Sequence, residues 1–173
     1  GIDLHAENFL THNLFCVLAH AEDNTWKNLL LICRRQPDGT YMLYETIWDL
    51  NYSFGDVFRY DFDRENVIFD PGTTASMRIR RDMDFVYCAL LEAVPSVKQQ
   101  TAALWQHWRS SGISAEHVCE MFRENEELLT LSGALARERE RWQTGEDSGS
   151  LAQTCKWVED RFRFLDQYYG YME

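Results

Sequence analysis

The stretch from Asp23 to Gly55 decides the fold, and it reads DNTWKNLLLICRRQPDGTYMLYETIWDLNYSFG. After a polar start, residues 29–32 form a short apolar run of the kind that is typical of a buried strand. Residues 37–39 (PDG) indicate a turn, and residues 41–48 predict a second strand. Because two such runs flank one turn, the stretch predicts a β-hairpin.

The segments on either side of this hairpin differ in character. Residues 5–20 predict a helix, since Leu10, Leu14, Val17 and Leu18 recur with helical spacing. Residues 49–82 show no clear period, and a loop of that length inside a compact domain is usually functional or mobile. From about Met83 onward the pattern is all-helical. We therefore expect a helix, a polar loop, a hairpin, an acidic loop and then a helical bundle.

Within the bundle, three helices have specific signals. One has the stripe Val97, Thr101, Leu104, Trp105 and Trp108. Ser114 predicts the N-cap of the next helix, whose residues Val118, Met121 and Phe122 should face inward. Residues 132–142 predict a further helix and residues 145–149 a linker. Ser150 should cap a last amphipathic helix with the stripe Leu151, Cys155, Val158, Phe162, Leu165 and Tyr169.

These elements predict an α+β fold that is mostly α-helical and forms a single domain over residues 1–173. Its first part, residues 1–82, holds the helix, the hairpin and the acidic loop, and residues 83–173 form a helical subdomain. The order of elements is that of the C-terminal lobe of a protein kinase, although order alone is an analogy.

Composition excludes several classes of function. The formal net charge of −11 disfavours nucleic acid as a partner, because such a surface repels phosphate backbones. An acidic site still accepts a nucleotide that arrives with a divalent cation. No apolar run reaches the roughly 18 residues that a membrane span requires. The cysteines have neither zinc-ligand nor framework spacing, so they are expected to be mostly buried free thiols: Cys16, Cys33, Cys88, Cys119 and Cys155.

Three side chains around the hairpin suit phosphoryl transfer, which needs a carboxylate near the attacking hydroxyl and oxygen ligands for magnesium. Asp23 and Asn28 have the D-x-x-x-x-N spacing of a kinase catalytic loop, and Asp49 follows the second strand as a metal ligand would. A hairpin returns its two ends to nearly the same place, so these residues are expected to converge. Lys27 is a candidate contact to phosphate.

Other interpretations of the same residues remain open. The Asp23–Asn28 spacing also suits a turn whose side chains bond the local backbone, Asp49 would equally brace its loop, and Lys27 would be a solvated loop residue. His20 lies three residues before Asp23 instead of the two found in ordinary kinases, so it is interpreted as loop support. The remaining histidines show no ligand spacing and are expected on surfaces or helix sides: His5, His12, His107 and His117.

The stretch from Asp23 to Gly55 resembles the CotH kinase family, the spore coat protein H-like atypical kinases. The family signature W-D-x-D-x-x-x-G reads WDLNYSFG from Trp48 to Gly55, with Asn51 where the family often has aspartate. Similar features downstream extend the resemblance over nearly the whole chain: residues 77–82, 98–110, 113–118, 139–142 and 163–166.

The resemblance implies a kinase-like fold that uses ATP and Mg²⁺ to phosphorylate serine or threonine hydroxyls of proteins, including spore coat proteins. By motif, Asp23 would be the catalytic aspartate, and Asn28 and Asp49 would bind the metal and its nucleotide. Asn51 would be a further ligand through its amide oxygen. A spore coat or cell-surface location follows by resemblance only, and a cytoplasmic one stays open.

Only 22 residues precede Asp23, which is too few for the N-terminal lobe of a kinase. We therefore expect a fragment, a separate lobe or a degenerate member of the family. One alternative is a catalytically inactive, kinase-like interaction module of a coat or surface assembly. A third hypothesis is a metal-dependent hydrolase that uses Asp23 and Asp49, with Asp61 and Asp63 as further contributors.

Overall fold

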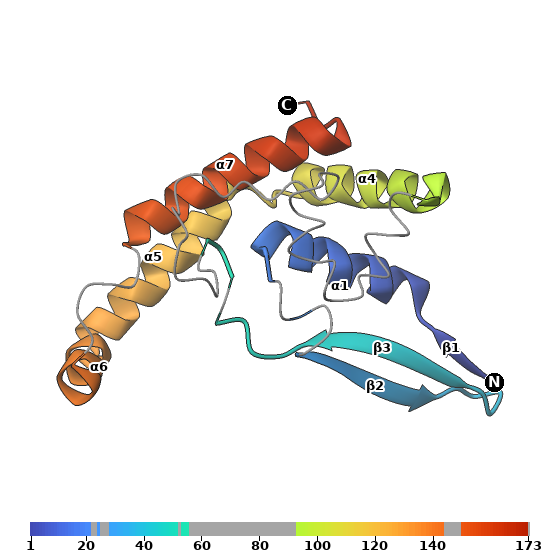
Figure 1. The fold of residues 1–173 in the computed structure, drawn as a ribbon, viewed down its shortest axis with the longest axis horizontal. Coiled ribbons are helices and arrows are strands. Elements are labelled where there is room, and N and C mark those ends of the chain that lie inside the picture. The colour runs from blue at the N-terminus through green and yellow to red at the C-terminus, as the bar shows by residue number, and fades with distance from the viewer. Residues whose placement is uncertain (22–23, 25–27, 52, 56–92, 144–149, 173) are drawn as a thin grey trace.

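The computed structural model describes residues 1–21, 24, 28–51, 53–55, 93–143 and 150–172. In these ranges it contains three strands and five helices (Figure 1). In chain order they are β1 (Ile2–Leu4), α1 (Ala6–Ala19), β2 (Leu29–Arg35), β3 (Tyr41–Ile47), α4 (Pro95–Ser110), α5 (Ala115–Leu131), α6 (Ala134–Trp142) and α7 (Leu151–Tyr169). The prediction of a mostly helical α+β fold is confirmed.

The strands form one sheet in the order β1-β3-β2. The predicted hairpin is confirmed, because β2 and β3 pair antiparallel with Leu29 opposite Ile47. Strand β1 pairs parallel to β3 and was not predicted. It has three residues, which is too short for an alternating pattern to be recognised in the sequence.

The expectation that β2 is buried is wrong. Leu30, Leu31 and Ile32 are about half exposed, at 46%, 53% and 49%. The reason is the place of β2 at one edge of the sheet, while α1 packs on the central strand β3. Three consecutive apolar residues on an edge strand therefore contact little of the described chain.

Helix α1 forms where its apolar spacing predicts it. His5 caps its first turn by accepting a hydrogen bond from the backbone N–H of Asn8, at 3.2 Å. Leu14, Val17 and Leu18 are buried in the core. The face that these three residues share packs α1 against α4 and α7, so the two parts of the predicted single domain have a common core.

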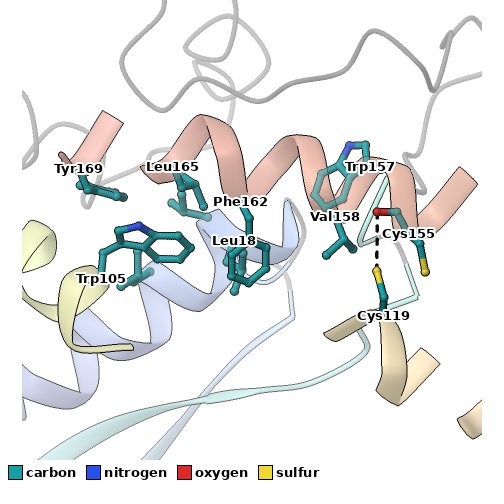
Figure 2. Packing of buried hydrophobic residues seen from close by; sticks show 11 residues of the cluster. Leu18, Trp105, Cys119, Cys155, Trp157, Val158, Phe162, Leu165 and Tyr169 are labelled. Atoms are coloured by element: carbon teal, nitrogen blue, oxygen red, sulfur yellow. Dashed lines mark hydrogen bonds between the residues drawn. The ribbon is translucent and has the colours of Figure 1, made fainter. Parts of the chain in front are cut away.

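The centre of the core lies between α4 and α7, with α1 beneath them (Figure 2). Trp105 of α4 is fully buried, and its ring lies 5.4 Å from that of Phe162 and 6.2 Å from that of Tyr169. The predicted stripe of α7 is confirmed, since its central members Val158, Phe162 and Leu165 are buried. Fully burying one such side chain stabilises a fold by about 1.5–3 kcal/mol.

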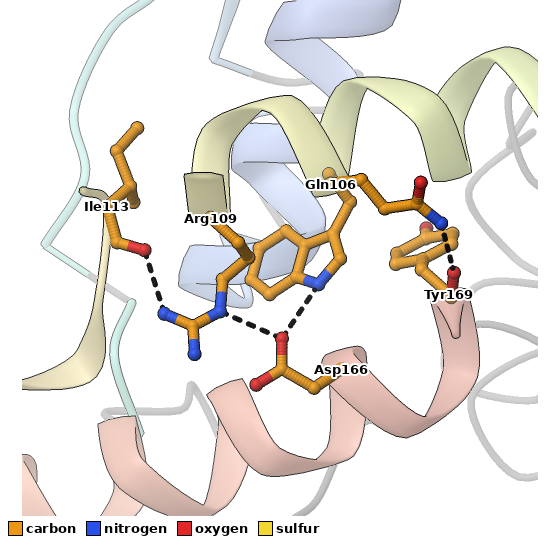
Figure 3. A network of polar contacts seen from close by, with 6 residues as sticks. Gln106, Arg109, Ile113, Asp166 and Tyr169 are labelled. Carbon is orange, nitrogen blue, oxygen red and sulfur yellow. Dashed lines mark hydrogen bonds and ion pairs between the residues drawn. The ribbon is translucent and has the colours of Figure 1, made fainter. Parts of the chain in front are cut away.

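A polar cluster fixes α4 against α7 at the edge of this core (Figure 3). One carboxylate oxygen of Asp166 accepts hydrogen bonds from Trp105 Nε1 at 3.0 Å and from Arg109 Nε at 2.9 Å. Arg109 also donates to the carbonyl of Ile113 at 2.9 Å. The same arginine therefore joins α7 to the loop that leads into α5.

The predicted helix caps are confirmed. The hydroxyl of Ser114 accepts from the backbone of His117, and Ser150 forms a capping box with Gln153. Met121, which was expected to face inward, is 51% exposed. The predicted linker at residues 145–149 and most of the predicted acidic loop lie outside the described residues.

Cysteines are free thiols wherever the structure describes them: Cys16, Cys119 and Cys155 are buried, and Cys33 is exposed. Cys119 donates a hydrogen bond to the carbonyl of Cys155 at 3.7 Å. Cys33 departs from the expectation of burial because it lies on edge strand β2. In the described part of the chain, every helix is too short or too polar to cross a membrane.

Candidate functional site at the base of the hairpin

The loop toward the candidate site begins at a sharp turn after α1. His20 adopts the left-handed conformation at φ 53°, and its N–H bonds to the carbonyls of Cys16 and Val17. Its side chain is buried, with the ring 6.3 Å from that of Trp157 on α7. This is the position expected for a residue that supports the loop.

Arg161 of α7 holds the same end of α1 and was not singled out in the sequence. It is buried, and its guanidinium donates through Nε and Nη2 to the carbonyl of Val17. A cation is favourable there, because the C-terminus of a helix carries partial negative charge. The guanidinium also lies 5.8 Å from the Trp157 ring.

Asn24 is the second residue that the sequence interpretation missed. It is buried, and its side-chain amide donates to the carbonyl of Trp48 at the end of the hairpin. Its own carbonyl lies 3.3 Å from Nε2 of His12 on α1. Asn24 therefore ties the loop to both α1 and the hairpin, and its amide has the bonding capacity that such a role requires.

His12 lies on α1, within the expectation of a surface or helix-side position, but it is buried and contacts Asn24 of this loop. Desolvation lowers the pKa of His12, and the contact with the carbonyl of Asn24 offsets this only in part. Its Nε2 also lies 3.5 Å from Sγ of Cys16. A ring with a lowered pKa is neutral at pH 7, so His12 adds no positive charge below the loop.

Asn28 and Asp49 lie side by side, as the hairpin predicted. The side-chain amide of Asn28 donates to the carbonyl of Asp49 at 3.4 Å, a long hydrogen bond. The pairing of Leu29 with Ile47 places them there. Asp49 has a φ of 58° and is exposed, so its carboxylate is open to solvent.

The other predicted site residues differ in what can be said of them. Asn51 is exposed two residues after Asp49. The contacts among described residues do not join Asn51 to Asn28. Asp23 and Lys27 lie outside the described residues, as do Asp61 and Asp63.

The segment after Asp49 is held against the two helices that frame the site. The N–H of Phe54 bonds to the carbonyl of Ala19 at 2.6 Å. Gly55 has a φ of +92°, and a β-carbon there would lie 2.9 Å from Cγ of Trp157. Only glycine fits this conformation and this contact without strain. Close packing against Trp157 therefore explains why glycine occupies the last position of the W-D-x-x-x-x-x-G segment.

A cluster of amides holds α1 on the central strand. The side chain of Asn8 bonds to both backbone groups of Glu45, at 2.6 and 3.1 Å. Asn13 donates to the carboxylate of Glu45 at 2.9 Å. Desolvation nonetheless raises the pKa of Glu45 to about 7. The cluster orients the hairpin relative to α1. It therefore also positions the end of the hairpin away from its turn, where Leu29 pairs with Ile47.

Asn28 and Asp49 provide the oxygen donors that Mg²⁺ prefers, an amide and a carboxylate. Asn28 donates through its nitrogen, and its amide oxygen is the atom suited to a cation. Among the residues that the structure describes, no group of three or more histidine, cysteine, aspartate or glutamate side chains could hold a metal ion.

An apolar cavity of about 460 Å³ lies behind the segment that follows Asp49. Helices α1, α4 and α5 line it, and Phe54 connects it to the candidate site. Its main lining side chains are Phe15, Leu18, Phe54, Trp108, Phe122 and Met121. The sequence patterns mark several of these residues as apolar, but they do not predict which helices meet.

Comparison of this chain with protein-family models, with curated proteins and with solved structures finds no match.

Proposed function

We propose that this chain is the C-terminal lobe of a CotH-like atypical protein kinase, which transfers the γ-phosphate of ATP to serine or threonine hydroxyls of a protein. The observation that carries the proposal is the juxtaposition of Asn28 and Asp49 at the open end of a hairpin that follows α1. Phosphoryl transfer needs oxygen ligands for the metal and a carboxylate near the attacking hydroxyl, and the loop after α1 and the hairpin base carry residues of these types.

In this proposal, Asp49 and Asn28 hold Mg²⁺ through the carboxylate and the amide oxygen, and Asn51 is a further amide ligand. The cation would neutralise charge on the phosphates of ATP. Asp23 would orient the attacking hydroxyl and accept its proton, and Lys27 would contact phosphate. The protein substrate is proposed to be a coat or surface protein, from the family resemblance alone.

The exposed sheet supports the expectation of a missing N-lobe. Residues Leu30 and Ile32 of β2 point to one face of the sheet, and Leu31 points to the other, because successive side chains alternate. All three are about half exposed. A second lobe that covers the hairpin would remove this apolar surface from water and would complete a nucleotide site beside Asp49.

The same observation favours a second candidate function, a catalytically inactive, kinase-like interaction module. An exposed apolar edge strand is a place where another chain adds a strand. In that case the sheet would bind an assembly partner, and the residues at the hairpin base would brace the loop without binding a nucleotide.

Calorimetric titration with Mg²⁺–ATP distinguishes the two functions. We expect binding that requires Mg²⁺ and that weakens about tenfold or more, or about 1.4 kcal/mol, in Asp49→Ala. The matched control is Asp38→Ala, which removes the same charge at the far end of the hairpin, where the carboxylate of Asp38 accepts hydrogen bonds from Thr40. This control should bind as the parent does.

If the isolated chain does not bind, the titration is repeated on a longer chain that includes a second lobe. Failure of that longer chain to bind Mg²⁺–ATP contradicts the kinase proposal and favours the interaction module. Equal losses in Asp38→Ala and Asp49→Ala would also contradict it, because they would reveal a general charge effect.

A further inference from the structure

The cavity behind Phe54 continues onto an exposed apolar surface of α5. Helix α5 runs away from the core formed by α1, α4 and α7, and α6 lies at its far end (Figure 1). One row of α5 residues begins in the cavity with Val118 and Met121 and continues toward the helix end. We call this row the α5 stripe, and it consists of Val118, Met121, Asn125, Leu128 and Leu129.

The spacing of the α5 stripe places it on one side of the helix, because residues three, four and seven apart share a face. Its outer members are well exposed: Met121 at 51%, Leu128 at 64% and Leu129 at 43%. Cys119, on another side of α5, packs against α7. Helix α5 thus contacts the core with one side and presents a second side that is apolar at Val118, Met121, Leu128 and Leu129, with Asn125 between them. Exposed apolar patches are often sites of interaction.

A row of acidic residues borders this stripe. Glu120, Glu124 and Glu127 are spaced by four and three residues along α5, and all three are exposed. One cation, Arg123, forms an ion pair with Glu120 at 2.9 Å. The chain as a whole has a formal net charge of −11. A partner that lies along α5 would therefore be favoured by positive charge at its edge.

The dimensions of this surface favour an elongated partner. A volume of about 460 Å³ has room for a few apolar side chains. The apolar surface then continues outside the cavity over Leu128 and Leu129. A compact ligand would fill the cavity and leave that row uncovered, whereas an amphipathic helix covers both with anchors at positions i, i+3, i+4 and i+7.

We propose that the cavity behind Phe54 and the α5 stripe together bind an amphipathic, basic helix of a partner protein. Its apolar anchors enter the cavity and cover the stripe, and its lysine or arginine residues lie along the row Glu120, Glu124 and Glu127. This proposal is independent of nucleotide binding at Asp49, so either can fail without the other.

The probe is a fluorescein-labelled synthetic helical peptide with leucine at i, i+3, i+4 and i+7 and lysine elsewhere, measured by fluorescence anisotropy. Two further peptides are compared with it, one of the same composition in scrambled order and one with glutamate in place of lysine. We expect the first peptide to bind at least about tenfold more tightly than either of the others.

Two variants of the same helix test the location. Met121→Glu adds a charge within the stripe, at a residue exposed enough to tolerate it, and should weaken binding about tenfold or more. Leu131→Glu adds the same charge at a residue that is 79% exposed and lies beside the acidic row, outside the stripe. It should bind at least as tightly as the parent, because the added charge lengthens the acidic row that faces the lysine residues of the peptide. Circular dichroism melting confirms that both variants fold.

Three results would overturn the proposal. The first is equal binding of the scrambled peptide, which would mean that charge alone attracts it. The second is an equal loss in Leu131→Glu, which would place the peptide elsewhere. The third is a dimer in sedimentation that Met121→Glu converts to a monomer, because the occupant of the stripe would then be a second copy of this chain.

Discussion

Replacing Gly55 by alanine tests how the segment after Asp49 is held in place. Gly55 has a φ of +92° and lies against α7, where a new β-carbon would be 2.9 Å from Cγ and 3.0 Å from Cδ1 of Trp157. Both the positive φ and the contact with Trp157 disfavour any residue other than glycine at position 55. Trp157 is buried and cannot yield without disturbing the core.

The expected magnitude combines three effects. A non-glycine residue held at such a φ costs about 1–3 kcal/mol, and overpacking against a buried ring costs about 1–3 kcal/mol more. Alanine also lowers the conformational entropy of the unfolded chain, which stabilises the folded state by about 0.4–1 kcal/mol. Gly55→Ala should therefore lower the free energy of unfolding by about 1–5 kcal/mol, or the melting temperature by roughly 2–4 °C per kcal/mol.

Gly112→Ala is the matched control, because Gly112 has a similar φ of +96° and a β-carbon added there would meet no atom within 4 Å. It should carry the backbone strain without the clash, so the two variants should differ by about 1–3 kcal/mol in urea unfolding. If Gly55→Ala is no less stable than Gly112→Ala, Trp157 does not confine this segment and the packing argument for Gly55 is refuted.

Two further predictions concern polar groups. The pKa of Glu45 is raised from 4.5 to about 7 in the folded protein. Protonated Glu45 therefore stabilises the fold fully below about pH 4.5, and this contribution is lost as the pH rises through 7. Glu45→Gln should remove this pH dependence from the free energy of unfolding measured in urea at a series of pH values, and an unchanged dependence would contradict the burial of the charge. Asp166→Ala should lower the free energy of unfolding by about 2–4 kcal/mol, because it leaves Trp105 Nε1 and the mostly buried Arg109 without their shared acceptor. Asp166→Asn keeps an acceptor and should cost less, and equal losses in the two variants would refute the role of these hydrogen bonds.

Local signals in the sequence were sufficient for most of the elements and for the caps of α5 and α7. The helical spacing of α1 and α7, the turn at residues 37–39 and the capping serines Ser114 and Ser150 each depend on residues within a few positions of one another. The hairpin also brought Asn28 and Asp49 together, because its geometry depends only on the pairing of two neighbouring strands. The role of these two residues in binding a nucleotide remains a prediction.

Tertiary packing decided what local signals could not. The apolar run of β2 is the same whether a strand is central or at an edge, and only the sheet order β1-β3-β2 makes it an exposed edge. Asn24 looked like a spacer between Asp23 and Asn28, and its role emerges only when the end of β3 is beside it. The cavity behind Phe54 likewise needs three helices from distant parts of the chain.

The sequence by itself thus determined the main helices, the two strands of the hairpin, the caps at Ser114 and Ser150, and that the two ends of the hairpin meet. The tertiary structure alone decided which apolar faces are covered, which glycine is confined, and which asparagine joins the loop to the hairpin. The physical reason is the separation along the sequence of the residues that interact. Propensity, capping and turn geometry act over a few residues, whereas burial depends on contacts such as that of Arg161 with Val17, made 144 positions apart.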